Sequence, residues 1–182
     1  MKPRTVVEYA VVALCAIAVA LLVQAYLVKP YRIPSESMAA TLKPRDRVLV
    51  NRVAYRLGDP GRGDVVVIDS RAVGRVLIKR VVGLPGDTIS LSGGHVYING
   101  RRLAEPYVRQ VDGRAEPTDP FRGTGNPWAL EQPYLVPSGH YFVMGDNRTV
   151  SDDSRDWGPA ARREIIGRAF FTYWPLSRLH GL

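Results

Sequence analysis

A continuous apolar run near the N-terminus is the strongest constraint on what this chain can fold into. From Tyr9 to Val28, 20 residues include a single strongly polar side chain, that of Gln24. A helix of about 20 residues rises about 30 Å, which matches the hydrocarbon core of a bilayer. Pro30 cannot continue a helix and marks the end of the segment. The run therefore predicts a transmembrane anchor helix at residues 9–28, preceded by a short cytoplasmic N-terminus at residues 1–8.

Two other interpretations of the apolar segment are open. A cleaved signal peptide would carry small residues at its processing site, and Ala18-Val19-Ala20 has that pattern. However, the apolar run continues through Val23, beyond the ~7–15 residues of a signal peptide's hydrophobic region. A buried soluble helix this uniformly apolar would be unusual at a chain terminus. We expect a single-pass anchor in the cell (plasma) membrane, although basic residues flank both of its ends and charge alone does not choose its orientation.

Composition limits the partners that the protein can have. The 182 residues are 46% hydrophobic and 23% charged, as in ordinary folded proteins. Lys and Arg number 25 against 17 Asp and Glu, and a net charge of +8 suits nucleic acid or an anionic membrane surface. The basic residues are scattered and form no arginine-rich arm, so we expect a lipid bilayer and no nucleic acid. The lone Cys15 and three dispersed histidines predict no metal site and no cofactor.

After Pro30 the pattern is typical of β-strands. Short runs of β-branched and aromatic residues alternate with turn signals, and Asn99-Gly100 favours a hairpin. No long stretch of 3.6-residue periodicity follows the apolar segment. We therefore expect a mostly β, antiparallel domain over residues 29–182, built as a small barrel or as packed sheets. The predicted strands are residues 47–51, 64–69, 75–82, 88–91, 95–98, 140–144 and 165–174.

Residues 102–132 differ from the rest of this domain. They are rich in Pro, Gly and charged residues, as in Asp112–Pro117 and Arg122–Pro127. Loops of this length without secondary structure of their own are uncommon within compact domains. We interpret the segment as a long, partly ordered insertion rather than as a second domain.

Three polar segments stand out, at residues 33–42, 78–87 and 144–155. Ser37 lies in a proline-led turn, where most serines are turn residues or helix caps. Lys79 interrupts an apolar strand, and period-two alternation places it on the same face as Leu77 and Val81. A lysine held among aliphatic groups loses hydration, so its pKa can fall toward ~7–8 and the neutral amine can accept a proton. The alternative is a lysine on an edge strand whose amine reaches water.

The third segment begins with Gly145-Asp-Asn-Arg148 and is dense in Asp and Ser. By itself it predicts a polar turn held by hydrogen bonds from side chains to the backbone and by an Asp–Arg pair. A metal-binding loop is the other interpretation, but the EF-hand spacing with its terminal Glu is absent.

In their order and spacing, these three segments resemble the conserved boxes of bacterial type I signal peptidases, the leader peptidases with a Ser/Lys dyad. The resemblance implies an N-terminal transmembrane helix followed by an antiparallel β catalytic domain on the extracytoplasmic side. It also implies a membrane-bound serine endopeptidase that removes signal peptides from exported preproteins, cutting after small residues at Ala-x-Ala sites. We expect the protein to be monomeric. The resemblance covers residues 33–42, 64–87, 105–107 and 141–158, and the apolar segment lies where the family has its anchor.

The resemblance also implies roles for individual residues. Ser37 would be the nucleophile and Lys79 its general base. Ser35 would help to hold the oxyanion beside the backbone N–H of Ser37, and Ser151 would orient the lysine amine. The residues that would support the loop are Asp153 and Arg155, and those that would line the substrate pocket are Ile33, Pro34, Met38, Leu42, Leu77 and Ile78.

The sequence departs from the family pattern at Glu36, Ala40 and Thr149-Val150, which bears on loop rigidity and substrate preference rather than on the dyad. A self-cleaving regulator of the repressor type would need a DNA-binding domain and no anchor, the reverse of this chain. Two alternatives stay open: a specialised maturation peptidase that serves one substrate, such as a pilin, and a non-catalytic, membrane-tethered β module that binds a partner. The second requires Ser37 and Lys79 to be dispensable and far apart.

Overall fold

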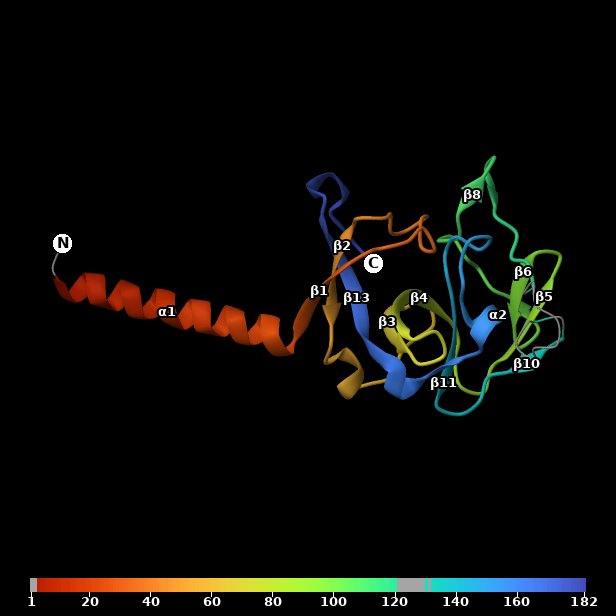
Figure 1. The fold of residues 1–182 in the computed structure, drawn as a ribbon, viewed down its shortest axis with the longest axis horizontal. Helices are drawn as coiled ribbons and strands as arrows, with labels where there is room; N and C mark the ends of the chain where they lie inside the picture. The colour runs from red at the N-terminus through yellow and green to blue at the C-terminus, as the bar shows by residue number, and fades with distance from the viewer. Residues whose placement is uncertain (1–2, 121–129, 131) are drawn as a thin grey trace.

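The computed structural model describes residues 3–120, 130 and 132–182, and it joins one projecting helix to a β-rich body (Figure 1). Helix α1 (Pro3–Tyr26) begins before the predicted segment and ends earlier than Val28. Val28 instead opens strand β1 (Val28–Arg32), which pairs antiparallel with β2 (Arg47–Asn51). Pro30 is tolerated within β1 because β1 is the edge strand of its sheet.

The described side chains of α1 are mostly apolar and exposed. Within the part of the chain that the structure describes, no helix combines the length and the apolarity of a membrane span. The large apolar side chains of α1 that are more than half exposed are Tyr9, Val11, Val12, Leu14, Ile17, Val19 and Leu21. The described body therefore leaves most of this helix surface uncovered.

The body is mostly β with antiparallel pairing, as predicted. Its larger sheet has the order β1-β2-β13-β3-β4-β11-β12, with β14 against β13. The second sheet has the order β10-β5-β6-β7, and β8 and β9 form a separate hairpin. The strands of the larger sheet not yet given are β3 (Val65–Ser70), β4 (Arg75–Gly83), β11 (His140–Met144), β12 (Ala160–Ala161), β13 (Ile165–Trp174) and β14 (His180–Gly181). The others are β5 (Thr88–Ser92), β6 (His95–Ile98), β7 (Arg101–Arg102), β8 (Gln110–Val111), β9 (Arg114–Ala115) and β10 (Tyr134–Leu135).

Short helical turns connect these strands. They are η1 (Ala54–Arg56), α2 (Ser154–Trp157), η2 (Arg162–Glu164) and η3 (Leu176–Arg178). Asp153 caps α2 by accepting a hydrogen bond from the Arg155 amide, while the Asp156 side chain accepts one from the Asp153 amide. This reciprocal cap satisfies amides at a helix start that would otherwise be unpaired.

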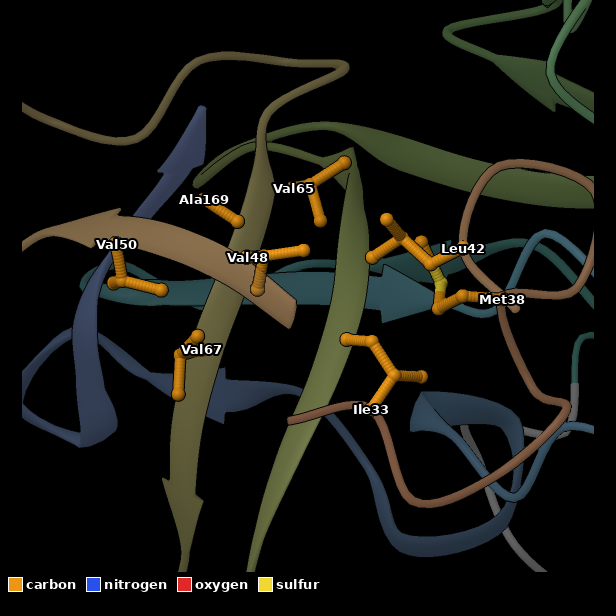
Figure 2. Close-up of a cluster of buried hydrophobic side chains, with 8 residues drawn as sticks. All are labelled: Ile33, Met38, Leu42, Val48, Val50, Val65, Val67 and Ala169. Carbon is orange, nitrogen blue, oxygen red and sulfur yellow. The ribbon is translucent and has the colours of Figure 1, made fainter. Parts of the chain in front are cut away.

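One apolar cluster joins the larger sheet to the loop that follows β1. Alternate residues of β2, Val48 and Val50, are completely buried on one face. Figure 2 shows Met38 and Leu42 directed into the same cluster from the loop, and both are almost fully buried. Burying side chains of this size stabilises the fold by ~1.5–3 kcal/mol each. The loop that carries Ser37 is therefore anchored on both sides of its turn by core packing.

The predicted insertion at residues 102–132 is described as far as residue 120, and again at 130 and 132; the rest lies outside the described residues. Its described part includes the β8–β9 hairpin and packs on the body. The Arg109 amide donates to the Asp146 carbonyl at 3.0 Å, and the Thr118 amide donates to the Gly94 carbonyl at 2.9 Å. The segment is thus tied to both the second sheet and the turn that follows β11.

Gly167 in β13 provides a test of the larger sheet. A Cβ atom there would come within 3.0 Å of the backbone of Asn51 in β2, which cannot move aside as a flexible side chain can. We expect Gly167→Ala to lower the free energy of unfolding by roughly 1–3 kcal/mol, as overpacking does. Thermal or urea unfolding followed by circular dichroism measures this.

The matched control is Gly61→Ala, because a Cβ atom at Gly61 would meet its nearest neighbour, Asp64, at an ordinary 3.7 Å. Equal stability of the two variants would contradict the close approach of β13 and β2.

Candidate active site

The loop between β1 and β2 presents a pair of serines. The hydroxyl oxygens of Ser35 and Ser37 lie 3.3 Å apart, within hydrogen-bond reach. Backbone bonds from Ile33 to Asp46 and from Arg45 to Ile33, both 2.9 Å long, close the base of this loop. Ser37 itself is half-buried, so its hydroxyl is held in place and still accessible.

The turn after β11 donates hydrogen bonds to the backbone of this loop. The Asn147 amide donates to the Ser37 carbonyl at 3.0 Å, and the Asn147 side chain donates to the Glu36 carbonyl at 3.1 Å. A Cβ atom at Gly145 would come within 3.0 Å of both the Ser37 carbonyl oxygen and the Ser151 hydroxyl. A glycine at this position therefore lets the two segments meet.

Lys79 lies on β4, between β3 and β11, and only 2% of its surface is exposed. The edge-strand alternative, with its amine in water, is thus excluded for this lysine. Its Nζ donates to the Ser151 hydroxyl at 3.0 Å. Burial lowers the pKa of Lys79 from its usual 10.5, and the more weakly acting Asp153 opposes this shift. The direction agrees with the prediction from the strand pattern.

The described contacts of Lys79 and Ser37 include no hydrogen bond between the two side chains. The structure brings them close through Ser151, because Ser151 bonds to Lys79 and its hydroxyl lies beside the same Gly145 as the Ser37 carbonyl. A hydrogen bond between nucleophile and base is often long or absent before substrate binds. The arrangement therefore supplies a hydroxyl and a buried amine in neighbouring positions, without a recorded bond between them.

Asp153 and Arg155 hold the turn that carries Ser151. The Arg155 guanidinium contacts the Asp153 carboxylate at 2.9 Å, and it also donates to the Arg148 carbonyl at 2.7 Å. Burial would raise the pKa of Asp153, but the Arg155 charge and the Gly145 amide outweigh it and lower that pKa. Asp153 therefore stays ionised and paired with Arg155, and among the charged groups near Lys79 it is the one that most opposes the lowering of the lysine pKa.

A second ionic cluster lies on the other face of β4. Arg80 contacts both carboxylate oxygens of Asp146, at 2.8 and 2.7 Å, and its guanidinium stacks 4.1 Å from the centre of the Tyr107 ring. Thr41 donates to the same carboxylate at 2.5 Å. This cluster links the serine loop, β4 and the turn after β11 through one buried carboxylate.

The sequence predicted an Asp–Arg pair in this turn, and Asp153 with Arg155 forms one, but the partners of the other charges were not predicted. Asp146 and Arg148 do not pair with each other: Asp146 binds Arg80, and Arg148 binds Glu105 at 2.5 Å. Sequence analysis did not single out Arg80, Thr41 or Asn147. Arg80 could have been noticed, because a second charged residue next to Lys79 in an apolar strand must be buried on the opposite face.

A cleft of about 230 Å³ opens beside Ser37. Five of the six predicted pocket residues line it, namely Ile33, Pro34, Met38, Leu77 and Ile78. Leu42 is not among the lining residues; it is completely buried in the core cluster of Figure 2. The cleft is mostly apolar.

Metal ligation finds no support in the described part of the chain. Among residues 3–120, 130 and 132–182, no group of three or more His, Cys, Asp or Glu side chains is arranged to hold an ion.

Comparison with known proteins gives a consistent picture. Residues 6–174 match the family described as signal peptidase, peptidase S26. Signal peptidase I of Leptolyngbya laminosa is 37% identical over 90% of this chain and 77% of that protein. Signal peptidase I S of Bacillus subtilis (strain 168) is 36% identical over 98% of this chain and 94% of that protein. A crystal structure of a signal peptidase I from Enterococcus faecalis V583 superposes with a TM-score of 0.50 at 36% identity, covering 60% of this chain and 96% of that one.

The burial of the Lys79 amine predicts how the stability of the protein changes with pH. Because burial lowers the pKa of Lys79 in the fold, the unfolded chain binds this proton more tightly than the folded chain. The wild type therefore loses stability as the pH falls from 10.5 through the folded pKa, and the loss is constant below it. We expect Lys79→Met to have a higher Tm than the wild type at about pH 6, with a gap that narrows toward about pH 10.

Thermal unfolding at a series of pH values measures the difference in Tm between Lys79→Met and the wild type. Lys43→Met, which alters an exposed lysine, is the matched control. A gap that widens as the pH rises would contradict the burial of a neutral amine.

Proposed function

The chain belongs to the signal peptidase family, peptidase S26, and is an enzyme that hydrolyses peptide bonds; from this premise we propose that it removes signal peptides from exported preproteins by a Ser37–Lys79 dyad mechanism. The observation that carries the proposal is the buried Lys79 amine, bonded to Ser151 beside the loop that bears Ser37. A serine hydroxyl is a weak nucleophile at neutral pH and needs a base within reach. A lysine whose pKa is lowered by burial is such a base.

In the proposed mechanism, neutral Lys79 accepts the proton of the Ser37 hydroxyl as its oxygen attacks the scissile carbonyl. The new oxyanion is stabilised by the Ser37 amide and the Ser35 hydroxyl, and losing one such donor typically costs ~10²–10³ in rate. The lysine then gives its proton to the departing amine. Lys79 next activates a water molecule that hydrolyses the acyl-enzyme ester and regenerates Ser37.

Ser151 suits the role of orienting residue because its hydroxyl accepts from Lys79 without bringing a negative charge. A carboxylate in its place would raise the pKa of the lysine and oppose its action as a base. Asp153 lies nearby, but its pairing with Arg155 limits that effect. Asp153 and Arg155 accordingly support the turn rather than take part in proton transfer.

Specificity follows from the cleft beside Ser37. The apolar lining by Ile33, Met38 and Ile78 favours apolar side chains and disfavours charged ones, whose burial without a partner is costly. We propose cleavage after small residues, as at Ala-x-Ala sites. The peptide that precedes the cut would lie along β1 and β4, whose residues supply the walls of the cleft.

The same proposal includes attachment to the cell membrane as a single-pass, monomeric protein with the β body on the extracytoplasmic side. Two observations support the membrane attachment: the apolar sequence from Tyr9 to Val28, and the exposed apolar side chains of α1, a helix that projects from the body (Figure 1). A large exposed apolar surface marks a site of contact with a membrane or a partner. Holding the active site near the bilayer would give it access to a signal peptide that is still inserted there.

Cleavage assays test the dyad. Detergent-purified wild type should cut a preprotein after the small residue of an Ala-x-Ala site, whereas Ser37→Ala and Lys79→Ala should lose at least ~10³-fold in kcat/KM. Because the neutral amine is the active form, kcat/KM should rise with pH through a Lys79 pKa that lies below 10.5.

Ser138→Ala and Lys43→Ala, which alter exposed residues, are the controls and should keep wild-type activity. The dyad is rejected if folded Ser37→Ala or Lys79→Ala cuts as fast as the wild type. An inert wild type, with these preproteins as substrates, would instead favour a narrower maturation peptidase or the non-catalytic module.

Cys15, the single cysteine of the chain, reports on the proposed anchor. In intact cells Cys15 should resist a membrane-impermeant maleimide, and it should react once detergent is added. In a Cys15→Ala background, Leu57→Cys replaces a side chain that is 92% exposed and should react in intact cells. Labelling of Leu57→Cys only after lysis would reverse the proposed orientation, and labelling of Cys15 in intact cells would exclude the anchor.

A further inference from the structure

Thr149, one of the departures from the family pattern, contacts a buried acid of the insertion. The Thr149 hydroxyl donates to the Glu116 carboxylate at 2.8 Å. Glu116 is only 7% exposed and follows the β8–β9 hairpin, 33 residues away in the sequence. A carboxylate buried to this degree requires hydrogen bonds, since an unpaired one would be costly.

Thr149 lies two residues before Ser151 in a tight turn. Within this turn the Ser151 amide donates to the Asn147 carbonyl at 3.1 Å, and the Val150 amide points to the same oxygen at 3.4 Å. Thr149 and Val150 are exposed, so core packing does not fix the outer side of the turn. The Thr149 amide also donates to the Glu116 carboxylate, but at a long 3.5 Å, so the hydroxyl makes the shorter of the two contacts.

The neighbouring contacts to the insertion bind other parts of the loop. Arg148 donates to Thr118 and to Glu105, each at 2.5 Å, and Arg155 donates to the Asp119 carbonyl at 2.9 Å. These bonds hold the two ends of the turn and are independent of Thr149. Losing the Thr149 bond should therefore leave the loop attached to the insertion and free the outer side of the turn to move.

We propose that Glu116 and Thr149 form a positioning pair, through which the insertion at residues 102–132 holds the Ser151 hydroxyl in place to receive the Lys79 amine. The consequence for catalysis rests on the proposed function, because it takes Lys79 as the general base. Neither Glu116 nor Thr149 touches substrate. Both act through the turn, and Ser151 acts on the lysine.

The pair matters chemically because Lys79 has a described hydrogen bond to one acceptor, the Ser151 hydroxyl. If the turn shifts outward, the hydrogen bond between the Ser151 hydroxyl and the Lys79 amine breaks, and water reaches the amine. Rehydration favours the ammonium form, so the pKa of Lys79 rises and the fraction of active base falls. The charged groups acting on Lys79 are Asp153, Asp152, Arg75 and Arg155, and a change at Thr149 alters none of them.

Thr149→Val tests the pair, because it removes the hydroxyl and keeps the shape and charge. The main measurement is the titration of Lys79 by NMR of its labelled side chain in the full, detergent-solubilised chain. Cleavage kinetics are measured in parallel. We expect the pKa of Lys79 to rise, kcat at neutral pH to fall roughly 10-fold to 100-fold, and KM to stay within about twofold. Thr149→Ser, which keeps the hydroxyl, should restore both values.

The matched control is Val111→Thr, the reverse isosteric change on the exposed strand β8, which should change neither quantity. Glu116→Met, which removes both acceptor oxygens, should reproduce the effect of Thr149→Val, and the double variant should add little to it, as expected for two members of one interaction. A merely structural pair would lower the Tm and leave the Lys79 titration and kcat unchanged.

The outcomes separate this inference from the proposed function. If the wild type cleaves preproteins and Thr149→Val leaves the Lys79 titration unmoved, the positioning pair is wrong and the dyad stands. If the titration moves but Ser37→Ala cleaves normally, the pair stands and the dyad is wrong.

Discussion

The burial of Lys79 on an inner strand is the constraint on which the site depends. An amine placed between β3 and β11 must be neutral or be compensated, since a buried unpaired charge is expensive. The amine donates to a neutral acceptor, Ser151, and Arg155 pairs with Asp153, an acid whose charge acts on the lysine. Burial nevertheless lowers the pKa of Lys79, which favours the neutral amine. The same burial carries a cost in stability, so the surrounding strands must supply the compensating apolar packing.

The strands could be predicted from the sequence because each carries its own local signal. Four strands have the predicted bounds, at residues 47–51, 95–98, 140–144 and 165–174. The other three predicted strands, at 64–69, 75–82 and 88–91, correspond to β3, β4 and β5 and differ from them by one residue at one or both ends. Strand β1 was missed because its residues, around Pro30, read as the exit of the apolar segment. Its strand structure comes from pairing with β2, a tertiary contact that no local pattern records. The short strand β12, which pairs with β11, was missed for the same reason. Strands β8 and β9 pair with each other across Asp112-Gly113, a local hairpin that the sequence analysis left within the irregular insertion.

The site, like the fold, could be predicted from the sequence only in part. The strand pattern drew attention to Lys79, and the resemblance to signal peptidases drew attention to Ser37 and Ser151. The structure places the loop, the strand and the turn that bear them against one another. What the sequence could not specify was the pairing of charges. Arg80, Asp146, Arg148 and Glu105 come from three separate segments, and which acid meets which arginine is decided by the sheet order. The sequence also could not show whether an apolar residue lines the cleft or fills the core, and Leu42 was placed in the cleft for this reason.

The sheet, the serine loop and the turn after β11 hold their parts of the site in different ways. Strand pairing holds Lys79 opposite Val66 of β3, and the pairing of β4 with β11 extends to Arg80, the next residue along the strand. The serine loop is held by the core packing of Met38 and Leu42, and it is joined to the turn after β11 by hydrogen bonds through Asn147 and Asp146. The outer side of that turn, at Thr149 and Val150, is exposed and lacks such packing. Displacing a catalytic group by about 1 Å can cost about 10²-fold in rate, so the position of this turn bears on the proposed chemistry. The described part of the insertion lies against it and is joined to it by buried and part-buried hydrogen bonds.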